Sequence, residues 1–466
     1  MPTLESLTGI TQIHLVGIGG IGVSALAPLL CRKGFTVTGS DPARNAVTDR
    51  LEKQGILIHH DHKAENIGGA SLLVVTSAVK EDNPELQAAR AKGIPIWPRA
   101  KMLGCLLRDY RAVVITGAHG KTTVTGMCVE WMLDSGLDPT AFVGGDLERI
   151  GGNSRVGQGE WAVAEGDESD GSFVYLQPEI AVVNNIDADH LDFYPDLDAI
   201  IASFNRFLEG VREGGWIVTS ADCVHCRRLT GRPGVPRLSY GFAGADIQAV
   251  NFQPDAHGSR CEVLIHGKRA GSLRLRVSGR MHCHNALAAL AVSHLIGVSF
   301  AQASESLSRF EGVRRRLEWI GEAEGVTVID DYAHHPTEIQ ATIQALRDRS
   351  PSRLIGVFQP HLYSRTLKLL DEFGGAFTGL DLLILTDIYP AREKPVPGVT
   401  GEVLKEPVQR HGVEVAYVPR LEDAASVAAP LAKAGDVIVT LGAGDVWKAG
   451  RLILEDLRKR KAGEGT

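Results

Sequence analysis

The sequence predicts an α/β protein of three domains, and three observations lead to that prediction. The chain has 466 residues, which at roughly 150 residues per domain corresponds to about three domains with a core each. Short runs of branched apolar residues alternate with segments of helical length over most of the chain, as in parallel sheets. Two glycine-rich loops, 100 residues apart, each follow such a run and precede a helical segment.

The first domain is predicted over residues 1–108 and is Rossmann-like. Its predicted strands are residues 13–17, 35–41, 72–76 and 94–96. A helix is expected over residues 23–32, because its apolar face is helical in period and Gly34 follows as an end signal. A strand, a glycine turn, a helix and a second strand make a βαβ unit.

The other two domains are predicted over residues 109–312 and 313–466. The central one begins with a strand at 112–116 and a helix at 123–133, the order of a P-loop mononucleotide-binding domain. Gly and Pro breaks between residues 210 and 268 indicate extra small strands there. The last domain is again Rossmann-like, with predicted strands at 326–330, 354–358, 382–386 and 437–440.

Composition excludes several classes of protein. A net charge of −7 gives no overall positive field, so no nucleic-acid partner is expected. No targeting pattern and no apolar stretch of ~18 residues occurs, so we expect a cytoplasmic protein with no membrane partner. Seven scattered cysteines argue against a disulfide framework, and Cys223 and Cys226 are interpreted as reduced thiols. Whether the chain is a monomer or a homodimer stays open.

The first glycine loop has the spacing of a dinucleotide fingerprint. Gly17, Gly19 and Gly22 follow a strand, and Asp41 stands 19 residues beyond the last of them. Taken alone, this pattern indicates an NAD-dependent oxidoreductase, a site for another nucleotide, or a purely structural turn. The loop has no lysine, so its backbone N–H groups suit a diphosphate that only needs to be bound.

The second loop, residues 116–123, differs because it carries Lys121 and Thr122. A strand before it and a helix after it are the context of a phosphate loop, in which the lysine contacts transferable phosphates and the hydroxyl binds Mg²⁺. The alternative is a chance Gly-Lys-Thr sequence in a helix cap. The two loops together suggest one nucleotide held as substrate and a second, ATP, consumed.

Acidic side chains follow the next two predicted strands. Residues 165–170 contain four carboxylates, and residues 187–190 contain two aspartates and His190. Ligands bind at the carboxyl ends of strands in α/β sheets, and a hard cation is the usual way to neutralise crowded carboxylates. A solvated acidic loop and a structural histidine are the alternatives.

These motifs, in this order, resemble the Mur ligase family over nearly the whole chain. The residues that carry the resemblance are 14–22, 76–79 with 83–85, 116–123, 165–173, 189–190, 282 with 285–286, 310–316, 330–338, 358–361 and 441–445. Within the family they are most similar to the branch that joins L-alanine to UDP-N-acetylmuramate in peptidoglycan precursor synthesis.

The resemblance implies a ligand for each domain. UDP-N-acetylmuramate would bind the first domain at Gly17, Ile18, Gly19, Gly20, Ile21, Asp41, Thr76 and Ser77. ATP would contact Gly117, Ala118, His119, Gly120, Lys121, Thr122, Thr123, His282, Asn285, Arg316 and Asp331. Mg²⁺ would be held by Thr122, Glu165 and His190, and L-alanine by His361 and Arg365. The residues implied to act on the reacting groups are Lys121, Arg316 and His190.

The implied reaction is ATP-dependent amide formation through an acyl phosphate. A carboxylate has oxide as its leaving group, whereas an acyl phosphate has phosphate, so phosphorylation must precede attack by the amine. An alternative in the same chemistry is the recycling ligase that attaches a tripeptide to the same sugar nucleotide. From other classes, an oxidoreductase would leave Lys121 and the last domain unused, and a P-loop switch would not explain an amino-acid domain.

Two departures from the family pattern bear on the site. No lysine occurs between Lys121 and Lys268, so the carbamylated lysine that several sister ligases carry there is ruled out. Leu362 stands after His361, where some members of the branch have arginine. The alanine carboxylate is therefore assigned to Arg365 or Arg392, and His334 and His335 are candidate bases by residue type only.

Overall fold

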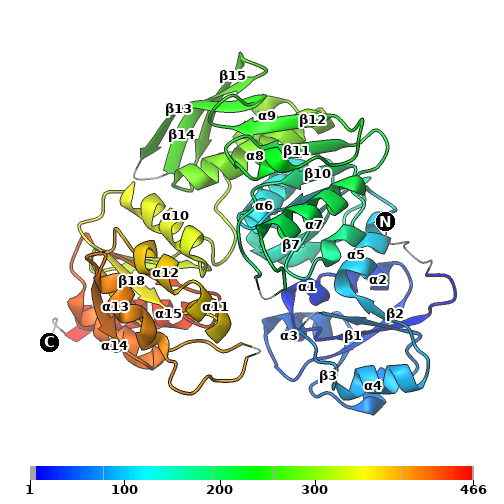
Figure 1. Ribbon diagram of the computed structural model, residues 1–466, viewed down its shortest axis with the longest axis horizontal. Coiled ribbons are helices and arrows are strands. Elements are labelled where there is room, and N and C mark those ends of the chain that lie inside the picture. Colours follow the sequence, from blue (N-terminus) through cyan, green and yellow to red (C-terminus); the bar gives the residue numbers. More distant parts are fainter. Residues whose placement is uncertain (1–6, 77, 192, 256–257, 392, 464–466) are drawn as a thin grey trace. The chain divides into compact units, whose positions relative to one another are not determined.

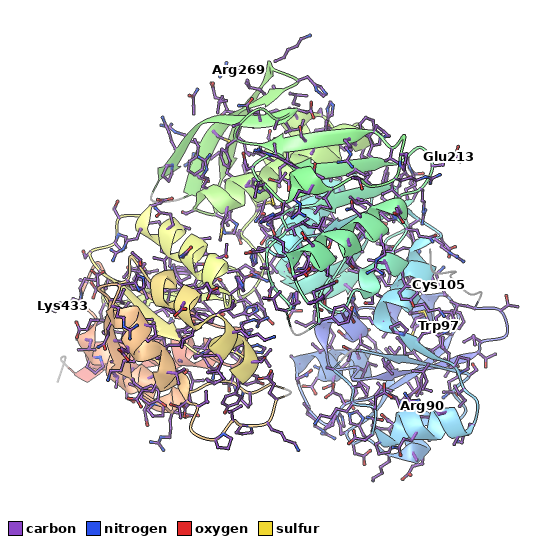
Figure 2. The ribbon with its side chains drawn as sticks, in the orientation of Figure 1. Arg90, Trp97, Cys105, Glu213, Arg269 and Lys433 are labelled. Atoms are coloured by element: carbon purple, nitrogen blue, oxygen red, sulfur yellow. The ribbon has the colours of Figure 1, made fainter. Side chains whose placement is uncertain are left out.

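A computed structural model describes residues 7–76, 78–191, 193–255, 258–391 and 393–463. Three sheets follow one another along the chain, and helices cover their faces (Figure 1). This is the predicted three-domain α/β architecture. Charged side chains such as Arg90, Glu213 and Lys433 stand on its surface (Figure 2). Within the described ranges, every helix is too short or too polar to cross a lipid bilayer.

The first sheet has five parallel strands in the order β3-β2-β1-β4-β5, a Rossmann-like arrangement. Its strands are β1 (Gln12–Val16), β2 (Thr36–Ser40), β3 (Leu57–His59), β4 (Leu72–Val75) and β5 (Ile96–Pro98). The helices around it are α1 (Ile21–Ser24), α2 (Ala27–Arg32), α3 (Ala46–Lys53), η1 (Ala64–Ile67), α4 (Pro84–Ala91) and α5 (Arg99–Leu107).

The helix predicted over residues 23–32 is in fact two helices, α1 and α2. Pro28 lies in the first turn of α2, where its missing N–H group costs nothing, whereas inside a continuous helix it would remove one hydrogen bond. The sequence prediction joined the two because their apolar residues keep one helical period across the break. The short α1 therefore stands alone directly after the glycine loop.

The central sheet has ten strands in the order β15-β14-β13-β12-β11-β10-β6-β9-β7-β8. They are β6 (Arg111–Thr116), β7 (Thr140–Leu147), β8 (Gly152–Arg155), β9 (Trp161–Glu165), β10 (Ile180–Val183), β11 (Trp216–Ser220), β12 (Arg237–Gly241), β13 (Ile247–Asp255), β14 (Gly258–Ile265) and β15 (Lys268–Leu275). The helical segments are α6 (Lys121–Asp134), η2 (Glu148–Ile150), η3 (Ser172–Tyr175), α7 (Leu197–Glu209), η4 (Cys226–Arg228), α8 (Arg280–Ile296) and α9 (Phe300–Leu307). Strand β6 lies between β10 and β9 and is parallel to both.

The last sheet has six strands in the order β16-β17-β21-β18-β19-β20. They are β16 (Glu318–Ala323), β17 (Val326–Asp331), β18 (Leu354–Phe358), β19 (Leu382–Leu385), β20 (Glu414–Tyr417) and β21 (Val437–Leu441). The helical segments are α10 (Pro336–Arg347), α11 (Tyr363–Lys368), α12 (Leu370–Ala376), η5 (Gly401–Leu404), α13 (Lys405–Gln409), α14 (Leu421–Leu431) and α15 (Trp447–Gly463). Only the edge strand β16 is antiparallel to its neighbour.

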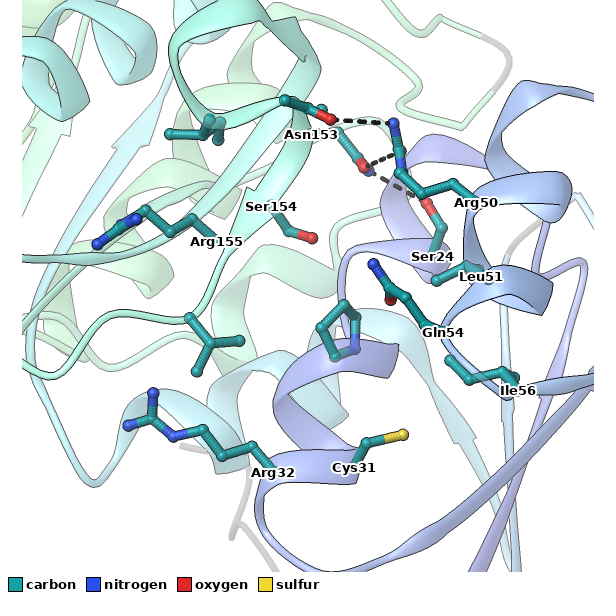
Figure 3. A pocket seen from close by; sticks show the side chains of 15 residues that line it. Ser24, Cys31, Arg32, Arg50, Leu51, Gln54, Ile56, Asn153, Ser154 and Arg155 are labelled. Carbon is teal, nitrogen blue, oxygen red and sulfur yellow. Dashed lines mark hydrogen bonds between the residues drawn. The ribbon is translucent and has the colours of Figure 1, made fainter.

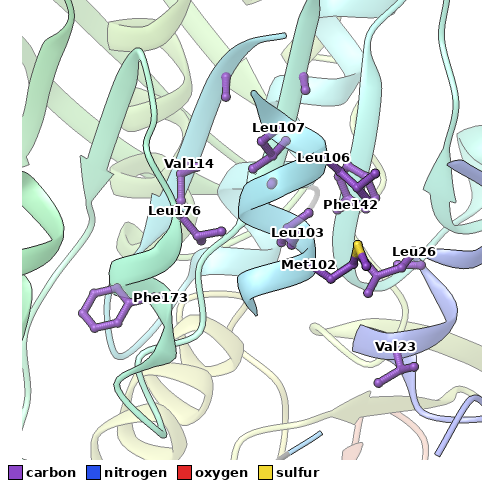
Figure 4. Packing of buried hydrophobic residues seen from close by; sticks show 14 of the residues in the cluster. Val23, Leu26, Met102, Leu103, Leu106, Leu107, Val114, Phe142, Phe173 and Leu176 are labelled. Atoms are coloured by element: carbon purple, nitrogen blue, oxygen red, sulfur yellow. The ribbon is translucent and has the colours of Figure 1, made fainter. Parts of the chain in front are cut away.

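Contacts divide the chain into two compact units rather than three. The first comprises Met1–Val250, Glu262–Leu273 and His284–Leu307, and the second Asn251–Cys261, Arg274–Cys283 and Ser308–Thr466. The two-unit division arises because helix α5 packs in one apolar core with both of the first two sheets. Its Leu103 and Leu106 share that core with Leu26, the residue before α2, and with Val114 and Phe142 of the central sheet (Figure 4). The predicted boundary near residue 108 therefore lies within continuous packing.

Candidate active site

The first glycine loop is closed onto the end of β2. The backbone N–H groups of Gly17 and Ile18 donate to the Ser40 carbonyl oxygen at 2.8 and 3.1 Å. The N–H of Gly19 donates to the Asp41 carboxylate at 2.9 Å. A Cβ atom at Gly19 would lie 2.7 Å from that carboxylate oxygen, so a larger residue here would displace the Asp41 side chain. Asp41 thus holds the loop itself through one of its oxygens.

The remaining residues predicted for the sugar nucleotide lie around the same loop. Gly20 precedes the first turn of α1, and Ile21 at its start is 42% exposed. Thr76 follows β4, and its methyl group would lie 3.4 Å from a Cβ atom at Gly17. Ser77 lies outside the described residues.

Asn153 of β8 joins the central sheet to the first loop. Its amide nitrogen donates to the Ile21 carbonyl oxygen at 2.6 Å and to the Ser24 hydroxyl at 3.1 Å. Its amide oxygen accepts a hydrogen bond from Arg50 of α3 at 3.0 Å (Figure 3). Asn153 is 2% exposed, so these bonds replace its contacts with water. Asn153, Ser24 and Arg50 line a cavity of about 400 Å³.

The second loop requires its glycines for space and for backbone conformation. Gly120 has φ +81°, and a Cβ atom there would lie 2.5 Å from the side chains of Asn184 and Asn285. Asn184 donates to the His119 carbonyl oxygen at 2.8 Å and to Asn285 at 2.9 Å. Asn185 accepts a bond from the N–H of His119 at 2.7 Å. Two asparagines at the end of β10 therefore fix the loop's shape.

Lys121 is the first residue of α6, and its side chain folds back over the loop. Its ammonium nitrogen donates to the Gly117 carbonyl oxygen at 2.6 Å and to the Ala118 carbonyl oxygen at 3.2 Å. A third bond, at 3.0 Å, goes to the Glu168 carboxylate. Burial opposes the charged form, but Glu168 and the neighbouring Asp167 outweigh it and raise the pKa of Lys121. The lysine is a permanent cation at the loop.

Two of the three predicted magnesium ligands are in contact. The Thr122 hydroxyl donates to a Glu165 carboxylate oxygen at 2.9 Å. His190, which has φ +54°, lies with its Nε2 atom 3.6 Å from Glu168. Burial lowers the basicity of His190, but Glu168 and Asp189 outweigh this and raise its pKa.

Glu168 adds an oxygen that the sequence prediction did not include. Its side chain is 3% exposed. Its Oε2 atom accepts no hydrogen bond from any described residue, although Lys121 lies 3.0 Å from it. A buried carboxylate oxygen with spare lone pairs, beside a hydroxyl and a second carboxylate, is a donor set that suits a hard divalent cation. These residues fit Mg²⁺.

A cavity of about 250 Å³ lies between the first loop and the acidic strand end. Gly20 and Gly22 line it on one side, and Glu165 and Asp167 on the other. Burial by itself raises the pKa of Asp167, but the charges of Lys121 and Arg99 outweigh it and lower that pKa. The first glycine loop and the acidic end of β9 therefore border one cavity.

Helix α8 carries both residues predicted for the adenine, three positions apart and so on neighbouring turns. Asn285 accepts the bond from Asn184 described above. His282 is 1% exposed, and neither ring nitrogen has a hydrogen-bond partner among the described residues. Burial, with Arg316 and Arg349 nearby, lowers the pKa of His282 to about 4. It is a neutral imidazole with two unused polar atoms.

In the second unit, Asp331 and Arg316 lie together at the end of β17. Asp331 accepts the backbone N–H groups of Leu317 and Ala333, both at 2.7 Å. Burial raises the pKa of Asp331 to about 6, with Arg316 opposing the rise. The Arg316 guanidinium lies 5.0 Å from the centre of the Tyr332 ring.

The residues predicted for the amino acid follow β18, which is separated from β17 by β21 in the same sheet. Arg365 Nη1 lies 3.4 Å from His361 Nδ1. The ring centres of Tyr389 and His334 each lie 5.7 Å from that of His361. Leu362, with φ +70°, holds a conformation that a branched side chain rarely adopts. Arg392 lies outside the described residues.

Sequence reasoning missed Asn153, Asn184, Asn185, Glu168 and Arg99 as site residues. Glu168 and the two asparagines stand in segments that the sequence had singled out as strand ends, so their position was a usable signal. Asn153 and Arg99 follow no motif. Their roles depend on packing between segments more than 50 residues apart.

Comparison with known proteins gives one consistent result. Residues 12–111 match the Mur ligase family, catalytic domain; residues 115–293 match the Mur ligase middle domain; and residues 315–444 match the Mur ligase, glutamate ligase domain. The UDP-N-acetylmuramate–L-alanine ligase of Desulfosudis oleivorans is 46% identical, over 95% of this chain and 98% of that protein. The protein of that name from Salinibacter ruber is 43% identical, over 97% of this chain and 96% of its own length.

Solved structures agree with the sequence comparison. The UDP-N-acetylmuramate-alanine ligase of Thermotoga maritima matches with a TM-score of 0.83 and 28% identity, over 96% of this chain and 99% of that one. The murein peptide ligase of Psychrobacter arcticus matches with a TM-score of 0.71 and 25% identity, over 96% of this chain and 99% of that one.

Proposed function

Because the chain belongs to the Mur ligase family, we propose that it joins L-alanine to the lactyl carboxylate of UDP-N-acetylmuramate at the expense of ATP. The observation that carries this function is end-to-end similarity to proteins named for that reaction. The two glycine loops are also compatible with this reaction. One suits a diphosphate that is only bound, and the other has a lysine for a phosphate that is transferred.

UDP-N-acetylmuramate is assigned to the first loop and ATP to the second. Residues 17–21, Asp41 and Thr76 are assigned to the diphosphate of UDP-N-acetylmuramate at the start of α1. The N–H groups of Gly17, Ile18 and Gly19 already donate to Ser40 and Asp41, so they hold the shape of the turn. The β- and γ-phosphates of ATP are assigned to the second loop, where Lys121 supplies a positive charge. Asn285 and His282 are assigned to the adenine, and Asp331 and Arg316 to the ribose and γ-phosphate.

The chemistry needs negative charge to be neutralised during phosphoryl transfer. A lactyl carboxylate oxygen attacks the γ-phosphorus, ADP leaves, and the amine of L-alanine then displaces phosphate from the acyl phosphate. Lys121 can stabilise the charge that develops on the transferring group. Mg²⁺, which Thr122, Glu165, Glu168 and His190 would hold, supplies further charge neutralisation when bound. His361 and Arg365 are assigned to the amino acid.

The other functions considered from the sequence have less support. For the recycling alternative, the relevant neighbour is the murein peptide ligase from Psychrobacter arcticus, whose name indicates a peptide substrate. That structure matches less well than the UDP-N-acetylmuramate-alanine ligase, with a TM-score of 0.71 against 0.83. An oxidoreductase would have no use for the second loop, and a P-loop switch none for the last domain.

Phosphate release from ATP tests the function directly. We expect release only when UDP-N-acetylmuramate and L-alanine are both present, with the amide product seen by mass spectrometry. Replacing L-alanine by the tripeptide L-alanyl-γ-D-glutamyl-meso-diaminopimelate should give little release. Faster turnover with the tripeptide than with L-alanine would assign the chain to recycling instead.

A further inference from the structure

Arg99 faces the cavity between the first loop and the acidic strand end, and no motif had drawn attention to it. It is the first residue of α5, and the cavity's lining places it beside Gly22, Thr76, Glu165 and Asp167. Among the described lining residues it is the only cation. The other charged groups of this lining are the carboxylates of Glu165 and Asp167.

The Arg99 side chain passes close to Gly22 of the first glycine loop. A Cβ atom at Gly22 would lie 3.0 Å from Arg99 Cδ, 3.1 Å from Nε and 3.4 Å from Cζ. Contacts of 3.0–3.4 Å are tighter than those that side chains normally tolerate, so the missing side chain of Gly22 gives Arg99 its place. The arginine is therefore held where ligands of the first loop bind.

Arg99 has no ionic or hydrogen-bonding partner within the part of the chain that the structure describes, apart from the longer-range attraction of Asp167. It is half-buried. An arginine presents five N–H donors, and leaving them unsatisfied away from bulk water costs free energy. Its position at the start of α5 adds a small cost, because a cation there meets the positive end of the helix dipole. An incoming anion would remove both costs.

We propose that Arg99 binds an anionic group of the sugar nucleotide and so is a substrate-binding residue of this site. This rests on the proposed function, which brings UDP-N-acetylmuramate to the first loop. The ligand chemistry is a pair of oxygens sharing one negative charge, which a guanidinium contacts with two parallel hydrogen bonds. Both the lactyl carboxylate and the diphosphate have it. For the carboxylate, Arg99 would also offset repulsion by Glu165 and Asp167.

Direct binding tests the proposal without turnover. Calorimetric titration measures the Kd of UDP-N-acetylmuramate and of UDP-N-acetylglucosamine, which has the same diphosphate but no lactyl carboxylate, for the full chain and for R99Q, R99K and K101Q. Lys101 is a matched control, because it lies in the same helix but stacks over Trp97, 4.4 Å from the ring centre, away from the cavity.

We expect R99Q to weaken the binding of UDP-N-acetylmuramate about 10- to 100-fold, as for a lost hydrogen bond to a charged group. R99K should lose less affinity than R99Q, because lysine keeps the positive charge but cannot form the bidentate pair of hydrogen bonds. K101Q should bind as the parent does. If only UDP-N-acetylmuramate loses affinity, Arg99 binds the lactyl carboxylate. If both ligands lose affinity equally, Arg99 binds the diphosphate.

Unchanged affinity for both ligands in R99Q and R99K would overturn the proposal and leave the proposed function standing. R99K guards against misfolding, since it is the smaller change, and the thermal unfolding midpoints of both variants are measured alongside. A parent protein that does not bind UDP-N-acetylmuramate would contradict the proposed function, and the assignment of Arg99 would be overturned with it.

Discussion

The Lys121 ammonium nitrogen lies 3.0 Å from both carboxylate oxygens of Glu168. The two residues come from different segments, the start of α6 and the loop after β9. Because the lysine also donates to two carbonyl groups of its own loop, its charge is held over the phosphate site before any nucleotide arrives. Such preorganisation lets a cation act without reorganising during the reaction.

Lys121→Met should lower kcat at least about 100-fold, the usual effect of removing one donor that stabilises charge in a transition state. Phosphate release under saturating substrates measures it. Lys92→Met, at an exposed lysine after α4, is the control and should keep full activity. Turnover within a few-fold of the parent would mean that Lys121 only shapes the loop.

Glu168→Gln should separate two roles of this carboxylate. If its unbonded Oε2 atom is a magnesium ligand, the Mg²⁺ concentration for half-maximal activity should rise about tenfold, because a neutral amide is a weaker ligand for a hard cation. The measurement is activity against Mg²⁺ at fixed ATP. An unchanged Mg²⁺ requirement with a lower KM for ATP would show that Glu168 acts only by pairing with Lys121.

Gly120→Ala should abolish ATP binding. The new methyl group would lie 2.5 Å from Asn184 and Asn285, at a residue with φ +81°. Gly136→Ala is a matched control, because Gly136 has φ +73° but no atom within 4 Å of its would-be methyl group. The control should cost about 1 kcal/mol of stability from backbone strain and keep its ATP affinity. Equal ATP affinity in both variants would argue against a steric requirement at Gly120.

Local pattern predicted the strands and loops that place the site. Val113, Val114 and Ile115 form a branched apolar run ended by a glycine loop, and such a run has few alternatives to a buried strand. Prediction was wrong where periodicity continued through a break, as at α1 and α2. It also missed β7 and β8, whose glycines and polar residues lack a strand pattern. Those strands form because the neighbouring sheet supplies their partners.

Candidate site residues could be selected from the sequence only where they belonged to a motif. Lys121 begins α6 directly after a strand and a glycine loop, and Glu165 ends β9; both stand in a recognisable pattern. Asn153 acts on Ile21, 132 residues away, and Arg99 acts in a cavity that exists only after folding. No local rule links such pairs, since their proximity is a result of tertiary packing. The ligand assignments of individual residues remain predictions.

Asn153→Ala should weaken the sugar-nucleotide site more than the ATP site. Removing its amide frees Ile21 and Ser24 from β8 and leaves Arg50 without its partner on that strand. Loss of buried hydrogen bonds of this kind costs about 1–3 kcal/mol, so KM for UDP-N-acetylmuramate should rise about 5- to 150-fold while KM for ATP stays close to the parent's. Ser154→Ala, at the next residue of the strand, should change neither constant. Equal rises in both constants for Asn153→Ala would indicate general destabilisation.

His282 should make the protein sensitive to acid. A histidine has a pKa of about 6.5 when unfolded, and burial lowers that of His282 to about 4. The unfolded chain therefore binds more protons between these values, so the stability from this group is complete above pH 6.5 and is lost as pH falls towards 4. At pH 5 the loss is on the order of 2 kcal/mol.

His282→Asn removes the titrating group and should flatten that dependence. Thermal unfolding midpoints of parent and variant, compared at pH 7.5 and pH 5.0, measure the difference, and the parent should lose several degrees more than the variant. His411→Asn, at an exposed histidine of the same unit, is the control and should follow the parent. If parent and His282→Asn lose equal stability over this range, His282 takes up no proton on unfolding, and burial does not keep its imidazole neutral.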